Sequence, residues 1–177
     1  MNKGHKRKSH ERRKDLAGEY RWGDTVQFIL FLVFIIGLIA DLFIVKISSS
    51  WQEVIPWYFR VVVFLPLIVI AVYFVQKAHQ KVFEEERKEL MVIKTDVFAM
   101  VRHPMYFGSI LTFLSFVVIS FSVISLLIFV IIVISYYYLC RYEEHLLLEK
   151  LESEYKNYMK NVPMLIPRVR NLSKDIE

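Results

Sequence analysis

Long apolar runs alternate with charged segments along the chain. Residues 26–45 and 56–75 are each almost wholly apolar. Each is long enough, as a helix rising ~1.5 Å per residue, to cross the ~30 Å hydrocarbon core of a bilayer. A charged insert at 76–100 follows, and residues 107–139 are again apolar throughout. This pattern predicts an all-α integral membrane protein.

The last apolar run is too long for a single straight span. As one helix, 107–139 would extend roughly 50 Å, well beyond the hydrocarbon thickness. Ser120, Phe121 and Ser122 near its middle favour two helices joined by a tight turn. One long tilted helix is the alternative. With the hairpin, the chain has about four transmembrane helices.

Residues 141–162 form an amphipathic pattern. Leu147, Leu151, Tyr155 and Tyr158 recur at three- and four-residue spacing, as on one face of a helix. We therefore expect a cytosolic C-terminal amphipathic helix that ends before Pro163.

The positions of the basic residues predict the orientation. Of 23 Lys and Arg residues, eight lie in the first 24 residues, six between 77 and 102, and seven from Arg141 onward. Only Lys46 and Arg60 flank the other side. The positive-inside rule then gives a multi-pass protein with both termini in the cytoplasm. A basic tail beside anionic lipid explains the net charge of +5, so we expect no nucleic-acid partner.

Composition excludes several classes of protein. The chain is 55% hydrophobic and 15% aromatic, unlike a soluble domain. Its single cysteine, Cys140, rules out an internal disulfide framework. His5 and His10 are too loosely spaced to suggest a metal site. Asp41 lies near the far end of the first span, where we expect water to reach it.

The first candidate site is Arg102-His103-Pro104-Met105-Tyr106, where the charged insert meets the third apolar run. Pro104 lacks an N–H and suits the first position of a helix. The open N–H groups and positive dipole end of that helix attract an anionic group. The alternative is a plain helix start with Arg102 and Tyr106 as interfacial anchors.

The second candidate site is Arg141-Tyr142-Glu143-Glu144, which follows the last apolar run directly. With four spans it returns to the membrane face of His103. Paired acids are unfavourable at the C-terminal end of a membrane helix, which points to a specific partner. The alternative is a solvated helix face on which Arg141 or Lys150 pairs with these acids.

Together the two clusters resemble the isoprenylcysteine carboxyl methyltransferase and phospholipid methyltransferase superfamily. The resemblance rests on Arg102-His103-Pro104-x-Tyr106-x-Gly108, the hairpin, Glu143-Glu144, Tyr155, Tyr158, Val162-Pro163 and Pro167, and covers about half the chain. It implies an integral-membrane enzyme that binds S-adenosyl-L-methionine in a cytosol-facing pocket and methylates a lipophilic acceptor. The basic tail is then 1–24, two transmembrane helices occupy 25–75, the catalytic region is 76–167 and a tail follows at 168–177.

The resemblance also assigns roles to residues. The catalytic candidates are Arg102 and Arg141, which could pair with an acceptor carboxylate. The residues implied to bind the cofactor are Leu90, Ile93, Phe98, His103, Pro104, Met105, Tyr106, Glu143 and Glu144.

Three departures from the family pattern bear on these roles. Leu139 stands where the carboxyl methyltransferases often have an arginine that holds the acceptor carboxylate. Asp96-Val97-Phe98 replaces a Gly-x-Tyr sequence, and the glycine usual before Tyr155 is missing. The acceptor therefore stays open between an isoprenylcysteine-type carboxylate and a lipid amine.

Two other functions fit the same sequence. Sterol reductases share some of this architecture, so a membrane reductase using NADPH is one alternative. The other is a membrane scaffold without catalytic activity, whose basic tail recruits a partner or anionic lipid.

The orientation is open to a direct test. Reporter fusions at Ser49 and at Glu177 should report opposite sides of the membrane, because the basic residues lie so unevenly along the chain. Reports from the same side would contradict the predicted topology.

Overall fold

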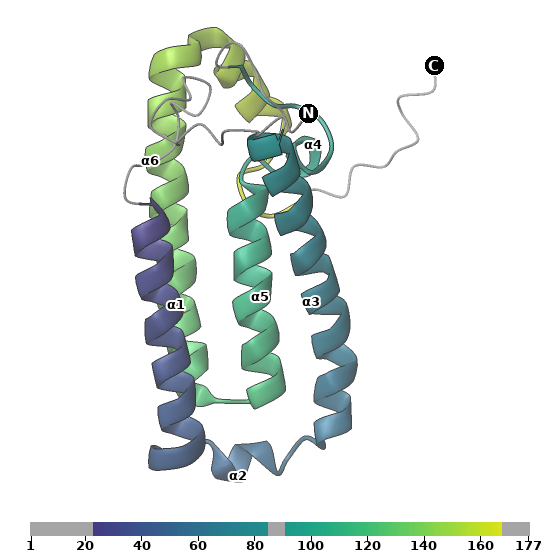
Figure 1. The fold of residues 1–177 in the computed structure, drawn as a ribbon, viewed down its shortest axis with the longest axis vertical. Coiled ribbons are helices and arrows are strands. Elements are labelled where there is room, and N and C mark those ends of the chain that lie inside the picture. Colours follow the sequence, from purple (N-terminus) through teal and green to yellow (C-terminus); the bar gives the residue numbers. More distant parts are fainter. Residues whose placement is uncertain (1–22, 85–90, 168–177) are drawn as a thin grey trace, which may run out of the picture.

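The computed structural model describes residues 23–84 and 91–167, in which helices and no strands occur. The elements are α1 (Gly23–Ile39), η3 (Ala40–Val45), α2 (Ser49–Gln52), α3 (Trp57–His79), η4 (Gln80–Glu84), α4 (Val97–Met100), α5 (Pro104–Ser120) and α6 (Val123–Asn161). The four long helices α1, α3, α5 and α6 form a bundle (Figure 1). The all-α prediction is confirmed, whereas residues 1–22 of the predicted basic tail, Leu90 and the final tail lie outside the described residues.

Within residues 23–84 and 91–167, three helical stretches are long and apolar enough to cross a membrane. They are Gly23–Val45, Trp57–Val82 and Val123–Asn161. The protein is therefore an integral membrane protein. Helix α5 is apolar but has only 17 residues, which corresponds to about 25 Å. A fourth complete crossing stays a prediction.

The predicted turn in 107–139 is confirmed. Helix α5 ends at Ser120, and Phe121 adopts a left-handed conformation with φ 52°. Ser122 then caps α6, because its side chain accepts a hydrogen bond from the backbone N–H of Ser125. Serine favours this position since its oxygen satisfies an otherwise open N–H group.

The C-terminal amphipathic segment is helical but is not a separate element after the last span. Helix α6 runs through Arg141 without interruption to Asn161, with non-helical dihedral angles at Glu152 (φ 41°, ψ −114°). The chain bends there, and the last turns of α6 point back over the bundle end that holds α4 (Figure 1). We call this the upper end and the end that holds α2 the lower end.

Glycines set two of the helix contacts. Helix α3 packs along α5, and α1 packs against α6. A Cβ added at Gly108 would lie 2.9 Å from the backbone oxygen of Ala71, and one at Gly37 would lie 2.2 Å from Ile128 Cδ1. Gly108 therefore lets the backbones of α5 and α3 approach closely, as is common between membrane helices, and Gly37 makes room for the Ile128 side chain.

Polar side chains hold the lower end together. Arg60 donates to the carbonyl oxygens of Ile55 and Gln52 at 3.0 and 2.7 Å, and Gln52 in turn donates to Ser120 O at 3.1 Å. Asp41 is only 1% exposed. The prediction that water reaches Asp41 is therefore wrong, because serines from two later segments surround it.

Of the four non-glycine residues with positive φ in the described part of the chain, Asp96 and Glu152 also have ψ far from the left-handed helical region. Asp96 has φ 55° and ψ −132°, and Glu152 has φ 41° and ψ −114°. Both resemble the first central position of a type II′ turn, which glycine dominates. The resemblance noted from the sequence expects a glycine at the position of Asp96 and another in the segment before Tyr155, where Glu152 lies. Each conformation costs on the order of 1–3 kcal/mol for a residue with a side chain.

Glycine at these positions should stabilise the fold. Glu152→Gly should raise the thermal unfolding midpoint in detergent by a few degrees, since relief of strain outweighs the ~0.5–1 kcal/mol that glycine loses in entropy. Asp96→Gly should do the same. The matched control is Ser153→Gly at the next, regular helical position, which should lower the midpoint. Equal losses from Glu152→Gly and Ser153→Gly would contradict the strain at Glu152.

Candidate functional site

The segment before α5 lies against the C-terminal end of the described chain. The backbone N–H groups of Arg102 and His103 donate to the carbonyl oxygens of Pro163 and Met164 at 2.9 and 3.2 Å. Pro104 is the first residue of α5, as predicted, and His103 precedes it with φ −120° and ψ 67°. Two segments about 60 residues apart thus pair by backbone hydrogen bonds beside the first candidate site.

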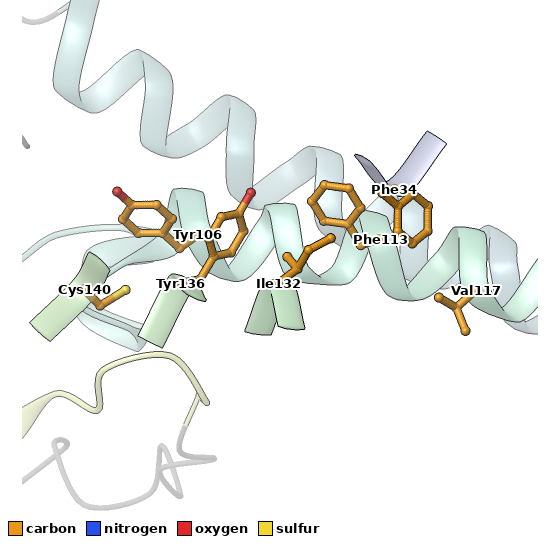
Figure 2. Close-up of a cluster of buried hydrophobic side chains, with 7 residues drawn as sticks. All are labelled: Phe34, Tyr106, Phe113, Val117, Ile132, Tyr136 and Cys140. Carbon is orange, nitrogen blue, oxygen red and sulfur yellow. The ribbon is translucent and has the colours of Figure 1, made fainter. Parts of the chain in front are cut away.

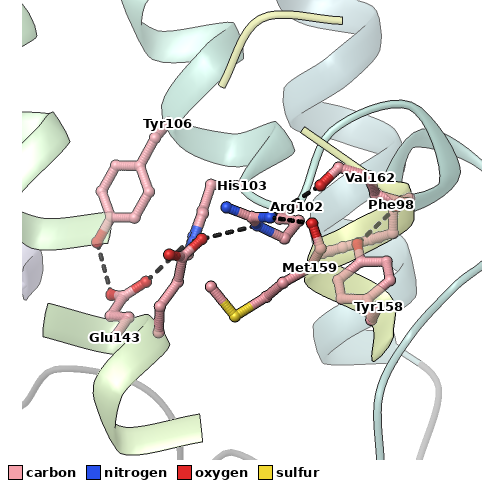
Figure 3. A network of polar contacts seen from close by, with 9 residues as sticks. Phe98, Arg102, His103, Tyr106, Glu143, Tyr158, Met159 and Val162 are labelled. Atoms are coloured by element: carbon pink, nitrogen blue, oxygen red, sulfur yellow. Dashed lines mark hydrogen bonds and ion pairs between the residues drawn. The ribbon is translucent and has the colours of Figure 1, made fainter. Parts of the chain in front are cut away.

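Arg102 and Glu144 form a buried ion pair. Arg102 Nε lies 2.7 Å from Glu144 Oε1, and their side chains are 10% and 2% exposed. Arg102 Nη1 also donates to the carbonyl oxygens of Met159 and Val162, at 2.9 Å each (Figure 3). These carbonyls close the C-terminal end of α6, where open acceptors and the helix dipole favour a cation. Arg102 therefore ties α6, at two places along its length, to the start of α5.

His103 lies between two carboxylates. Its Nδ1 is 3.5 Å from Glu143 Oε2, and its Nε2 is 3.4 Å from Glu144 Oε1. Tyr106 donates its hydroxyl to Glu143 Oε1 at 2.7 Å, so Glu143 joins His103 to Tyr106 (Figure 3). His103 Nε2 and Glu144 Oε2 are buried without a hydrogen-bond partner of good geometry. Such open polar groups are unusual in a folded interior and call for an explanation.

The pKa of His103 is raised well above its ordinary value. Burial alone lowers this pKa, but interactions with the Cys140 thiol, Glu143 and Glu144 outweigh that effect. A protonated His103 balances one of the two carboxylate charges that face it.

The structure thus brings five of the predicted site residues together: Arg102, His103, Tyr106, Glu143 and Glu144. Other members lie elsewhere. The side chains of Phe98 and Met105 pack against the cluster around Phe74 on α3, and Arg141 is exposed. Ile93 is half-buried, and Pro104 is buried at the start of α5.

Sequence reasoning missed Cys140 and Tyr136, which extend the site along α6. Cys140 is fully buried, and Tyr136 is 1% exposed with its ring centroid 5.2 Å from that of Tyr106. Both precede Glu144 at four-residue intervals, so helical periodicity could have placed them on its face. Figure 2 shows this buried row running from Cys140 and Tyr106 past Tyr136 to Phe113 and Phe34.

A cavity of about 330 Å³ lies beside this row, between α1 and α3 and over α5. Its apolar wall is mainly aromatic, from Phe31, Phe34, Phe113 and Phe116. Its polar lining consists of Gln27, Ser109, Thr112 and Tyr136. Ser109 and Tyr136 lie close to Tyr106, so the cavity approaches the Glu143 cluster. We call this cavity the α1–α3 groove.

The model of the phospholipid methyltransferase family matches residues 62–154, which is more than half of the chain. The chain belongs to this family. The match includes Arg102, His103, Tyr106, Glu143 and Glu144, so the buried cluster lies within the part that defines the family. The protein is therefore a membrane methyltransferase, and methyltransferases of this family generally use S-adenosylmethionine.

The family match favours the methyltransferase over the reductase and scaffold interpretations. No curated protein and no solved structure matches the chain significantly.

The two adjacent glutamates of this methyltransferase should differ in their effect on stability. Glu144→Ala leaves Arg102 buried without its carboxylate, which typically costs ~3–5 kcal/mol. It should lower the thermal midpoint sharply and expose the chain after Glu152 to limited proteolysis. Glu143→Ala should have a smaller effect, since that carboxylate is more exposed, at 14%.

Glu149→Ala is the matched control, because this glutamate lies on α6 with a 60% exposed side chain. Its midpoint should equal that of the unaltered protein. Similar midpoints for Glu144→Ala and Glu149→Ala would show that the Arg102–Glu144 pair is not needed for the fold.

Proposed function

We propose that this protein transfers a methyl group from S-adenosylmethionine to the amine of a membrane lipid. The observation that carries the proposal is the buried cluster of Glu143, His103 and Glu144, in which Arg102 is already engaged by other groups. The cluster sits next to the α1–α3 groove, so polar and apolar surfaces meet at one place.

The side chains of the cluster suit the cofactor chemically. Glu143 can accept hydrogen bonds from a ribose diol or an ammonium group, and charge-assisted bonds of this kind are the stronger class. His103 Nε2 and Glu144 Oε2 have no hydrogen-bond partner in the same cluster, so both atoms can form hydrogen bonds with a ligand. The Tyr106 ring can favour a sulfonium by ~0.5–2 kcal/mol. We propose Glu143, His103, Tyr106 and Glu144 as the core of the cofactor site.

The other residues that the sequence suggests for the cofactor site would contribute backbone N–H groups or support the segment before α5. The backbone at Pro104 and Met105 begins α5, where N–H groups suit a carboxylate. Ile93 and Leu90 precede this segment, and Phe98 supports it, since Phe98 O accepts the Tyr158 hydroxyl at 2.6 Å. We propose that Ile93 and Phe98 support the site from the side of the insert, whereas Leu90 lies outside the described residues.

S-adenosylmethionine supplies an electrophilic methyl group when it is bound. The task of the chain is then mainly to hold the acceptor in line with that group and to exclude water. An acceptor amine must also lose its proton before it can attack. Glu143 is the carboxylate in the cluster that is partly exposed, so it is our candidate to accept that proton.

The charges around the cluster favour an amine over a carboxylate. The Nε group of Arg102 donates to Glu144, and its Nη1 group donates to the carbonyl oxygens of Met159 and Val162. Arg141 is exposed and Leu139 is apolar. The sequence-based proposal that Arg102 or Arg141 pairs with an acceptor carboxylate gains no support from this geometry. We instead assign Arg102 a positioning role.

The α1–α3 groove supports a lipid acceptor. Its aromatic lining suits a hydrocarbon chain, and its polar residues Ser109 and Tyr136 lie toward Tyr106 and Glu143. A lipid with its chain in the groove would therefore present its head group to the cluster.

The acceptor class can be tested by methyl transfer from labelled S-adenosylmethionine to aminophospholipids and to prenylcysteine analogues across pH 6–9. We expect methylation of the aminophospholipid, with a rate that rises with pH through the pKa of the amine. Glu143→Ala should abolish transfer, while Glu149→Ala should leave it unchanged.

Exclusive methylation of the prenylcysteine carboxylate would contradict the amine assignment. Exclusive methylation of a water-soluble acceptor would contradict the lipid-bound route as well. Unchanged activity in Glu143→Ala would remove that residue from the site.

A further inference from the structure

Asp41 anchors the lower end of α1 through a network of serines. Ser48 Oγ and Ser122 Oγ both donate to Asp41 Oδ2, and the backbone N–H of Ser48 donates to Oδ1 at 3.3 Å. All three residues are at most 2% exposed. Asp41 follows α1, whereas Ser122 is the N-cap residue directly before α6, so the carboxylate joins segments 81 positions apart.

The same serines complete the first turn of α6. Ser48 Oγ accepts the N–H of Val123 at 2.8 Å, and Ser122 Oγ accepts the N–H of Ser125 at 3.1 Å. A serine hydroxyl has one hydrogen and two lone pairs. Because each hydroxyl accepts from α6, its hydrogen is free to be donated to Asp41. An ionised Asp41, which only accepts, therefore fits both serines at once.

Apolar packing holds the rest of helix α1, since Phe34 is fully buried in the cluster with Phe113, Ile132 and Tyr136. The helix packs against α6, most closely where Gly37 meets Ile128. On its other side the α1–α3 groove separates its upper half from α3. The family model begins at residue 62, so α1 and Asp41 lie outside the matched region.

We infer that Asp41 is a positioning residue that fixes α1 as one wall of the acceptor groove. Phe31, Phe34 and Gln27 of α1 line that groove, and the hydrocarbon chain of the lipid acceptor is its occupant. Loss of the carboxylate leaves two buried hydroxyls and the backbone N–H of Ser48 without their common acceptor. The wall then loses its polar attachment at the lower end and keeps only its apolar packing, whereas the cluster around Glu143 at the opposite end keeps its own contacts.

The inference rests on the proposed function, but its structural half can be measured alone. Spin labels at Ile29 on α1 and Ile134 on α6, both exposed, report the separation of these helices in a Cys140→Ala background. Asp41→Ala should broaden and lengthen the distance distribution. Asp24→Ala, which removes an exposed acid at the start of α1, is the matched control and should leave it unchanged.

The functional half separates acceptor binding from cofactor binding. In the Cys140-containing protein, Asp41→Ala should raise the KM for the aminophospholipid several-fold, while the Kd for S-adenosylhomocysteine stays the same. Asp41→Asn should give a KM between those of the unaltered protein and Asp41→Ala, since its amide retains one acceptor oxygen. If Asp41→Ala does not fold, Ser48→Ala removes one of the contacts and should give the same pattern with a smaller amplitude.

An unchanged distance distribution in Asp41→Ala, Asp41→Asn and Ser48→Ala would overturn the anchoring role. A longer distance with an unchanged KM would overturn the groove-wall role. If the unaltered protein methylates no lipid amine but Asp41→Ala still displaces α1, the proposed acceptor fails while the anchor is supported.

Discussion

The structure depends most on the buried pair of Arg102 and Glu144. A carboxylate that is 2% exposed is unfavourable without a partner, and the guanidinium of Arg102 supplies one at 2.7 Å. The same guanidinium holds the carbonyl oxygens at the end of α6. One side chain therefore fixes the start of α5, the middle of α6 and the C-terminal segment together. This arrangement sets His103 between Glu143 and Glu144.

Each end of the bundle is held by a carboxylate with different partners. Glu144 at the upper end pairs with Arg102, a cation that also binds the Met159 carbonyl oxygen near the C-terminal end of α6. Asp41 at the lower end takes hydroxyl donors, since the N-terminus of α6 has N–H groups to satisfy. The two ends leave the apolar middle of the bundle to helix packing through Gly37 and Gly108. The groove beside α5 lies between these two anchored ends.

Much of the fold could be predicted from the chain itself. Hydrophobic run lengths located the first two long helical stretches, and Ser122 marked the turn before α6, but the continuation of α6 to Asn161 was not predicted. The proximity of His103 and Glu143 was predicted from the number of transmembrane helices and from the family resemblance. These features depend on local composition and on helix geometry, which a sequence displays directly.

The features that were missed depend on contacts between distant segments. We expected water to reach Asp41, because no sequence pattern links this residue to its partners Ser48 and Ser122. Arg102 looked available for an acceptor because its partners include carbonyl oxygens, which any residue carries. The bend at Glu152 had no glycine to mark it. In each case the missing information was three-dimensional proximity.

The proposed reaction requires that a methyl donor binds at the Glu143–His103 cluster while Arg102 keeps its present partners. The most direct measurement is an experimental structure of the protein with S-adenosylhomocysteine in a lipid nanodisc. We predict nucleoside density in contact with Glu143, His103 and Tyr106, with the Arg102–Glu144 pair intact. A ligand bound elsewhere, or an Arg102 that leaves Glu144 to bind the ligand, would contradict the account.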